Sequence, residues 1–188
     1  MNIGIIIGSS ILAVVFIIVI IINNQIVSKK NQVAQAYGSI EIYLKKRFDL
    51  IPNLVAMLNK YLTHEKEVLL KVTALRSHVN SAQDPQEKIE VSNELTNLIG
   101  GLNINVENYP ELKADKQFIN LQYNLTDIED QISAARRAYN AAVTSYNNKT
   151  QMFPVNIIAG IRKDKVNTLL EIPKAEQKEV NINQLLNS

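Results

Sequence analysis

The chain has no cysteine and no tryptophan among its 188 residues, and it has only six glycines and five prolines. Without cysteine there is no disulfide framework, no thiolate metal site and no cysteine nucleophile. The lack of tryptophan and the small number of glycines argue against a barrel and against a nucleotide-binding α/β fold. The net charge is only +2 and the basic residues are scattered, which disfavours nucleic acid as a partner.

What the sequence does have is a long uncharged run over residues 3–22. At about 1.5 Å of rise per residue, a helix of this length spans about 30 Å, the thickness of the hydrocarbon core of a bilayer. A lone segment in lipid satisfies all its backbone groups only as a helix. We therefore predict a short N-terminus and one transmembrane helix over residues 1–22, with the lipid bilayer as the partner of residues 3–22.

A cleaved signal peptide is the alternative for this run. It requires a basic start, a shorter apolar stretch and a small-x-small cleavage site directly after it. Only Met1 and Asn2 precede the run, and Ala34-x-Ala36 lies about a dozen residues beyond it. The sequence thus favours a retained, single-pass anchor.

The orientation of the anchor is predicted from the lysines that flank it. Lys29 and Lys30 follow the span, and no basic side chain precedes it. The positive-inside rule then places residues 23–188 in the cytoplasm and the N-terminus outside.

The rest of the chain repeats its apolar residues with a helical period. We expect helices over residues 23–48, where no proline interrupts a possible continuation of the span, over 52–79, from Pro85 to about Tyr109, and from Asp115 past Tyr146. Asp49 and Asp115 are expected caps, and Asp84 with Pro85 is a strong start signal. We expect a polar turn over residues 80–83.

Short links between these segments predict an all-α fold, in which the anchor is followed by an antiparallel up-and-down bundle of about four long helices over residues 23–151. One long coiled coil is the alternative, and the capped turns argue against it. Residues 103–106 alternate with period two, so a short extended segment competes there with a helix kinked near Gly100 and Gly101. Residues 152–188 are expected to be largely irregular, with Ile157 and Ile158 as the last core contacts.

Several segments together resemble the LemA family in order and spacing over about residues 33–160. They are residues 43–55 (YLKKRFDLIPNLV), Tyr61 with 64–66 (HEK), 107–114 (ENYPELKA), Phe118, 134–140 (AARRAYN) with Tyr146 and Asn147, and 153–159 (FPVNIIA). The resemblance implies a short extracytoplasmic N-terminus, one span, a bundle of long antiparallel helices and no known catalytic activity. Some relatives are linked to bacterial envelope biology and some to membrane organelles such as magnetosomes. The chain departs from the family at Asn103, at Asn105 and in the tail after Ala159.

Within these segments we expect eleven residues to have structural or interaction roles: Arg47, Asp49, Pro52, Asn53, Tyr109, Pro110, Arg136, Tyr139, Asn140, Phe153 and Pro154. In the heptads of the last long helix, Glu129 and Arg136 flank the core seam and Arg137 points outward. We expect Arg136 to pair with an acid on a neighbouring helix, and a substrate-binding role is the alternative.

Three other features have a structural and a functional interpretation. Residues 45–47 lie too far along the first helix to reach lipid headgroups and are expected to flank the following turn. His64 and His78 are too far apart to share a metal ion on one helix, which favours a solvated surface. The many tyrosines are expected to bond to Asn or Arg across the bundle, and a tyrosine-lined partner groove is the alternative.

No nucleophile–base pair, metal spacing or phosphate loop is present in the sequence, so we expect neither enzymatic activity nor a cofactor or metal. The leading hypothesis is a scaffold or adaptor in a bacterial cell membrane or internal organelle membrane, which presents its bundle to envelope or membrane proteins. The alternative is a structural protein that assembles with itself and shapes the membrane. Gly4-x-x-x-Gly8 is a spacing that lets two helices approach closely.

Overall fold

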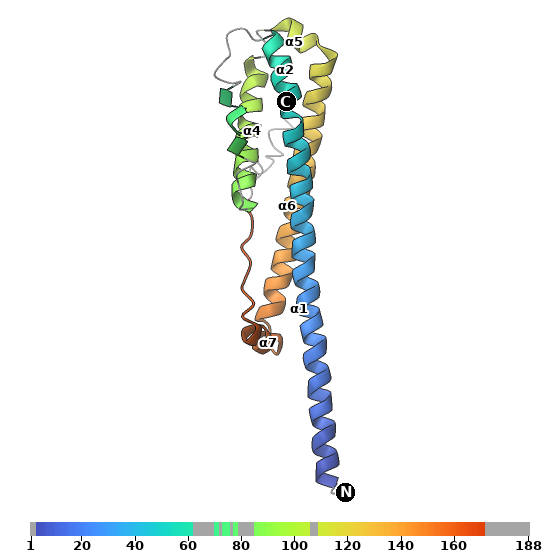
Figure 1. Ribbon diagram of the computed structural model, residues 1–188. Helices are drawn as coiled ribbons and strands as arrows, with labels where there is room; N and C mark the ends of the chain where they lie inside the picture. The colour runs from blue at the N-terminus through green and yellow to red at the C-terminus, as the bar shows by residue number, and fades with distance from the viewer. Residues whose placement is uncertain are drawn as a thin grey trace, which may run out of the picture.

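The computed structural model describes residues 3–61, 85–105 and 109–171, together with 70–71, 73–75 and 77–78. All the regular secondary structure within these residues is α-helical, which confirms the all-α fold class. The elements are α1 (Ile3–Asp49), α2 (Ile51–Tyr61), α4 (Pro85–Asn105), α5 (Pro110–Ala114), α6 (Lys116–Gln151) and α7 (Val155–Arg162). Figure 1 shows a long, narrow molecule in which the N-terminal part of α1 extends alone beyond the other helices.

Helix α1 is continuous over 47 residues and has two parts with different surroundings. Its large apolar side chains from Ile3 to Ile21 are exposed, and one 18-residue window has a mean hydropathy of 3.3. Burial begins at Ile22 and Ile26, where the other helices first contact it. The predicted continuation of the apolar helix into the bundle is therefore confirmed, and this helix is long and apolar enough to cross a membrane.

The antiparallel pair of α1 and α6 forms the centre of the bundle (Figure 1). The rings of Tyr37 and Tyr139 meet edge to face with centroids 6.2 Å apart. The apolar stripe predicted for α6 is buried almost throughout, as expected for a heptad seam. After Tyr139 the stripe was predicted to pass through Ala142, but Ala142 is only partly buried and Val143 is buried instead. The buried apolar residues of α6 are Phe118, Leu121, Leu125, Ile128, Ile132, Ala135, Tyr139, Val143 and Tyr146.

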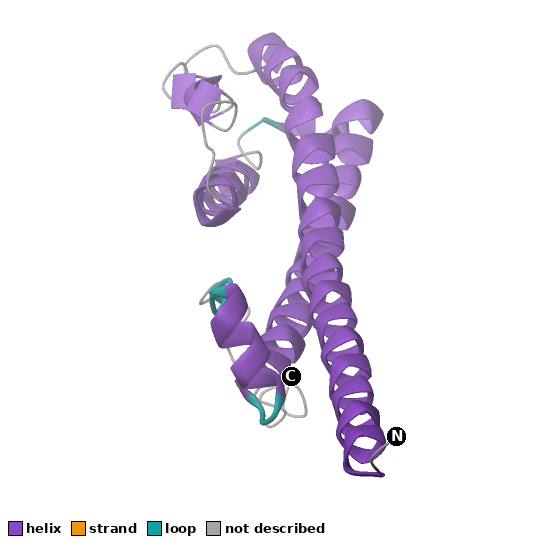
Figure 2. Cartoon of the chain, turned by 60° about the horizontal axis from the view of Figure 1, so that its bottom comes forward, coloured by secondary structure: helices purple, strands orange, loops and turns teal. Residues whose placement is uncertain are grey.

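The shorter helices cover this pair in two places. Helix α4 adds Ile89, Val91 and Leu95 to the main core. Helices α2 and α5 close the far end, where a smaller cluster includes Leu54 and Leu112. In Figure 2 all the described elements that surround α1 and α6 are helices or loops.

The structure decides two of the boundary predictions. Helix α4 begins at Pro85, as predicted, and it continues through Asn103 to Asn105, so the extended alternative is wrong for these residues. Val106, the polar turn at 80–83 and most of the predicted second helix beyond Tyr61 lie outside the described residues. Asp49, which was expected to lie between two helices as a cap, is instead the last residue of α1. Pro52 lies in the first turn of α2, as predicted.

The segment after Pro154 differs from the prediction in two ways. Residues 155–162 form α7, which the fading periodicity did not predict. Ile157 is 56% exposed, and the last buried apolar residue in the described chain is Leu170 rather than Ile158. Eight residues give only two turns, too few for an apolar period to be recognised in the sequence.

The predicted cap of α6 is confirmed. Asp115 Oδ1 accepts hydrogen bonds from the backbone N–H groups of Gln117 and Phe118. The Tyr61 hydroxyl donates to the other carboxylate oxygen at 2.7 Å, so the same side chain also connects α2 to α6. The Tyr61 bond and then the Gln117 bond lower the pKa of Asp115, because both favour the carboxylate form.

We expect Asp115→Ala to lower the midpoint of thermal unfolding by about 3 °C at neutral pH, because α6 loses its cap. The pKa of Asp115 is lower in the folded than in the unfolded protein. The stability that the ionised carboxylate contributes is therefore fully present above the pKa of the unfolded protein, about 3.9. It is lost as the pH falls through the lower pKa of the folded protein. Circular dichroism melts in detergent at neutral and acidic pH measure this difference. Asp130→Ala, an exposed position on α6, is the matched control, and equal effects of the two variants at neutral pH would contradict the prediction.

Candidate functional site

The most polar part of the core is a cluster around Arg47, where α1, α4 and α6 meet. The Arg47 side chain is only 2% exposed. Its Nη1 donates to Ser92 Oγ at 2.7 Å and also to the Glu129 carboxylate, with which it forms an ion pair. Its Nη2 donates to Thr96 Oγ1, also at 2.7 Å. One side chain from α1 thus holds two residues of α4 and one of α6.

The apolar stripe of α1 explains why Arg47 is buried. Ile40, Leu44 and Arg47 follow each other at spacings of four and three, so Arg47 occupies a position that faces α6. We expected residues 45–47 to flank the turn after the first helix. Lys45 and Lys46 are exposed near that turn, whereas the Arg47 side chain is buried in the core instead. The spacing of Arg47 from Ile40 and Leu44 could have identified it as a core residue. Because it is charged, it was instead assigned to the exposed turn.

Arg136 is the second buried arginine of the cluster, also 2% exposed. Its Nη2 donates to Asn93 Oδ1 on α4 at 3.4 Å. The predicted position of Arg136 at the seam is correct and Arg137 is exposed, whereas the acid of the seam, Glu129, is bound by Arg47. The contact described between Arg136 and a neighbouring helix is thus with the amide oxygen of Asn93, where an acid was expected.

Burial and the charge of Glu129 shift the pKa of Arg47 in opposite directions. Removal from water is the largest influence and lowers the pKa of its guanidinium, whereas the charge and the hydrogen bond of Glu129 raise it. The nearby charge of Arg136 lowers it further. Because an arginine stays protonated in proteins, the result is a fixed positive charge whose partners must stay in place. The cluster can therefore hold three helices together.

A second polar arrangement holds the chain that follows α7. The Asn140 side chain on α6 accepts a hydrogen bond from the backbone N–H of Leu170 and donates to its carbonyl oxygen, both at 2.9 Å. One heptad later, Asn147 does the same with the N–H and carbonyl of Asn167. Each amide side chain thus pairs with both backbone polar groups of one residue, as a residue of a neighbouring β-strand would. Asn140 was a predicted site residue, and this is the contact it makes.

The other predicted residues have separate locations and do not form one site. Tyr139 packs against Tyr37 in the core, whereas Asp49, Pro52 and Asn53 lie exposed around the α1–α2 turn. Tyr109 precedes α5, and Pro110 is the first residue of that helix. Phe153 is 80% exposed, and Pro154 directly precedes α7.

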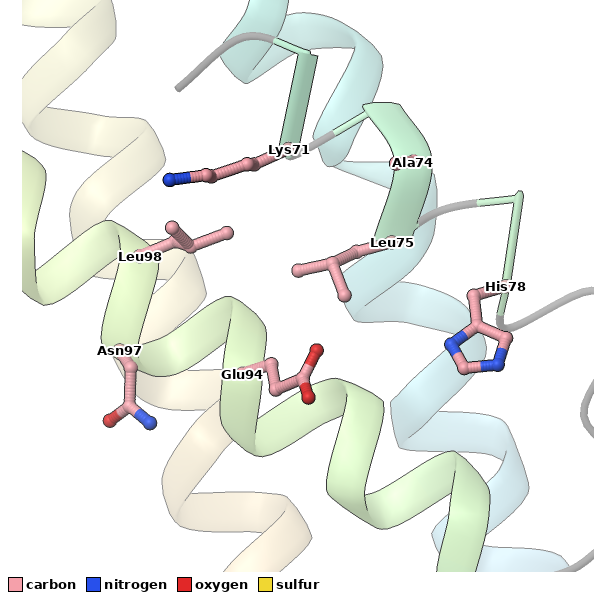
Figure 3. Close-up of a pocket in the computed structure, with 7 residues that line it drawn as sticks. All are labelled: Lys71, Ala74, Leu75, His78, Glu94, Asn97 and Leu98. Atoms are coloured by element: carbon pink, nitrogen blue, oxygen red, sulfur yellow. The ribbon is translucent and has the colours of Figure 1, made fainter. Parts of the chain in front are cut away.

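An open groove of about 640 Å³ lies between α4 and the residues around Leu75 (Figure 3). Leu75 and Leu98 point into it, and Lys71, His78 and Glu94 are spread along its edges rather than directed at one point. His64 lies outside the described residues, and those described contain no group of three His, Cys, Asp or Glu side chains placed to bind a metal ion. The lining residues are Lys71, Ala74, Leu75, His78, Glu94, Asn97 and Leu98.

The fold and its polar contacts define a class of protein: a long helical bundle built on an N-terminal apolar helix that is long enough to span a membrane. The model of the LemA family matches residues 36–183, so this chain belongs to the LemA family. This result confirms the resemblance found in the sequence and extends it past α7.

Two kinds of relatives share sequence with the chain. Protein LemA of Metamycoplasma hominis is 28% identical over 166 residues, which cover 87% of this chain and 75% of the relative. The magnetosome proteins MamQ 1 and MamQ 2 of Paramagnetospirillum magneticum are each 34% identical over 65 residues. That stretch is 35% of this chain and 24% of each MamQ protein.

We expect Glu129→Gln to lower the free energy of unfolding by about 3 kcal/mol, because Arg47 remains buried without its counter-charge. The matched control is Glu41→Gln, which breaks the partly exposed Lys88–Glu41 pair between α4 and α1 and should cost less than about 1 kcal/mol. Denaturant unfolding in detergent, followed by circular dichroism, measures both. Equal and small effects of the two variants would show that the Arg47 pair does not stabilise the bundle.

Proposed function

We propose that this protein is a non-enzymatic, membrane-anchored scaffold or adaptor that presents its helical bundle to other membrane or envelope proteins. The observation that carries this proposal is the continuity of α1, which runs without a break from Ile3 to Asp49. The membrane part and the bundle share one helix, so the bundle has no flexible linker at the point where it leaves the bilayer. Such an arrangement suits a fixed platform.

The polar groups of the molecule support the same proposal. The charged cluster around Arg47 is internal and its described groups bond to one another, and Asn140 and Asn147 hold the chain's own backbone. These groups are used to hold the bundle rigid. Its outer faces remain for partners.

Lys29 and Lys30, just beyond the apolar part of α1, are the basis for the proposed orientation, with the bundle in the cytoplasm and the N-terminus outside. Lys30 is exposed and Lys29 partly exposed. Single-pass insertion and this orientation belong to the proposal.

A self-assembling structural role is the second candidate, and the surface of the anchor favours it. Gly4 and Gly8 lie one turn apart on α1, and a Cβ atom added at either would have no neighbour within 4 Å. This open small-residue surface would let a second α1 approach closely in lipid. The partial similarity to two magnetosome proteins is compatible with a structural role at a membrane.

Cross-linking in native membranes separates the two candidates. An adaptor should yield cross-linked products with one or a few distinct proteins when the chain is expressed at its native level. A self-assembling protein should yield a ladder of its own oligomers, and Gly4→Ile with Gly8→Ile should abolish that ladder, whereas Ile5→Leu, the control, should not. Recovery of only the monomer at native expression would contradict both candidates.

The orientation can be tested because the chain has no cysteine. A Ser188→Cys variant should react with a membrane-impermeant thiol reagent only after the cells are permeabilised. Labelling in intact cells would overturn the cytoplasmic placement and leave the anchor unaffected. Replacing Lys29 and Lys30 with glutamine, together with two lysines added at the N-terminus, should move a fraction of the molecules to the labelled state.

A further inference from the structure

Helix α7 is fixed beside the point where the apolar run of α1, residues 3–22, ends. Arg162, at the end of α7, donates a hydrogen bond to Asn23 Oδ1, and Asn23 is the first residue after that run. Val155 and Ala159 of α7 are buried in the same cluster as Ile22 and Ile26 of α1. These contacts place α7 at the level where the exposed apolar part of α1 begins.

The two ends of α7 lie at about the same height along α1. The Arg47–Glu129 and Tyr37–Tyr139 contacts define an antiparallel register that places the end of α6, Gln151, near position 25 of α1. The other end of α7 is bonded to Asn23. Helix α7 therefore runs across α1 rather than along it, and Figure 1 shows it at the end of the bundle from which the lone part of α1 emerges.

The chain before and after α7 lies farther from the membrane span than α7 does. Helix α6 approaches it from the far end of the bundle, and the segment after α7 returns along α6, where Asn147 binds Asn167 and Asn140 binds Leu170. Among the described residues outside α1, those in and next to α7 are thus the nearest to the membrane span. The asparagine contacts hold the returning segment, and with it the position of α7.

The face of α7 that points away from the bundle is apolar. Phe153, Ile157 and Ile161 are spaced by four residues and are 80%, 56% and 78% exposed. On a helical wheel of α7, Ile157 and Ile161 lie opposite Val155 and Ala159, which are buried in the core, and Phe153 lies just before the helix. Met152, beside them in the chain, is 61% exposed. Exposed apolar residues gathered on one face of a helix mark an interaction surface.

From these observations we propose that the surface formed by Met152, Phe153, Ile157 and Ile161 inserts into the interfacial layer of the same bilayer that α1 crosses. The proposal rests on the membrane anchoring proposed above. Lipid is the occupant because the surface lies at the same level as the first lipid-exposed residues of α1 and continues their apolar surface. Lys163 and Lys165, both exposed just after α7, are then placed at the level of the headgroups, as in helices that lie in a membrane interface.

This contact would give the protein two attachments to one membrane. A single span tilts by about 20° on average, and its tilt and rotation are set by interfacial anchors and by neighbouring helices. With α7 lying across α1 at the membrane surface, the tilt of the bundle and the face it turns toward partners become fixed. A scaffold that lacked α7 would still be anchored, but it would not hold one orientation over the membrane.

The lack of tryptophan allows a direct test with the full-length protein. Ile157→Trp places one fluorophore on the proposed contact, Leu12→Trp places one in the span, and Tyr123→Trp places one on an exposed site near the start of α6, at the end of the bundle far from the span. Each variant is reconstituted into phosphatidylcholine–phosphatidylglycerol vesicles, with and without bromine on the acyl chains. We expect blue-shifted, bromine-quenched emission from positions 12 and 157, and red-shifted, unquenched emission from position 123.

The three positions separate the possible failures. If position 12 is quenched and position 157 is not, the proposed contact of α7 is wrong and the anchor stands. If position 12 is not quenched, the anchoring itself is wrong. Blue-shifted but unquenched emission from position 157 would show that a protein, such as a second copy, covers the surface, and would also overturn the proposal. Ile161→Trp repeats the test at a second position if circular dichroism shows that Ile157→Trp has lost helix.

Discussion

The ion pair between Arg47 and Glu129 is the interaction on which the rest of the structure depends. Taking a guanidinium out of water costs several kcal/mol, and only a carboxylate with further hydrogen bonds in good geometry offsets this. Here the carboxylate comes from α6, and two of the further acceptors, Ser92 and Thr96, come from α4. A shift of one helix by a turn would leave Arg47 buried without these partners. Apolar contacts alone would tolerate such a shift more easily.

The register set by this pair determines what happens at the membrane end. With Glu129 beside Arg47, the rings of Tyr37 and Tyr139 meet, and α6 ends close to the end of the apolar run of α1 at Ile22. Only then can α7 turn across the end of the bundle, bury Val155 in the same cluster as Ile22 and bring Arg162 to Asn23. A contact near the far end of α1 thus places α7 at the membrane exit, because α1 and α6 are long, continuous helices.

Sequence reasoning succeeded where the signal was local. The stripe from Phe118 to Tyr146, the cap at Asp115 and the start at Pro85 each depend on residues within a few turns of one another. It failed where the partner was distant or the element short. Arg47 was expected at a turn because its partner, Glu129, is 82 positions away, and α7 was missed because it has only eight residues. Asn140 was selected from the family resemblance, but nothing in the sequence connects it to Leu170.

A double-mutant cycle on Arg47 and Glu129 tests the central claim most directly. Arg47→Met, Glu129→Leu and the double variant are compared with the parent chain in denaturant unfolding. If the pair holds α1 and α6 together, the two substitutions are strongly non-additive, with a coupling energy of about 2 kcal/mol or more, and the double variant is more stable than the less stable single variant. Additivity within about 0.5 kcal/mol would show that the two side chains act independently and would contradict this account of the bundle.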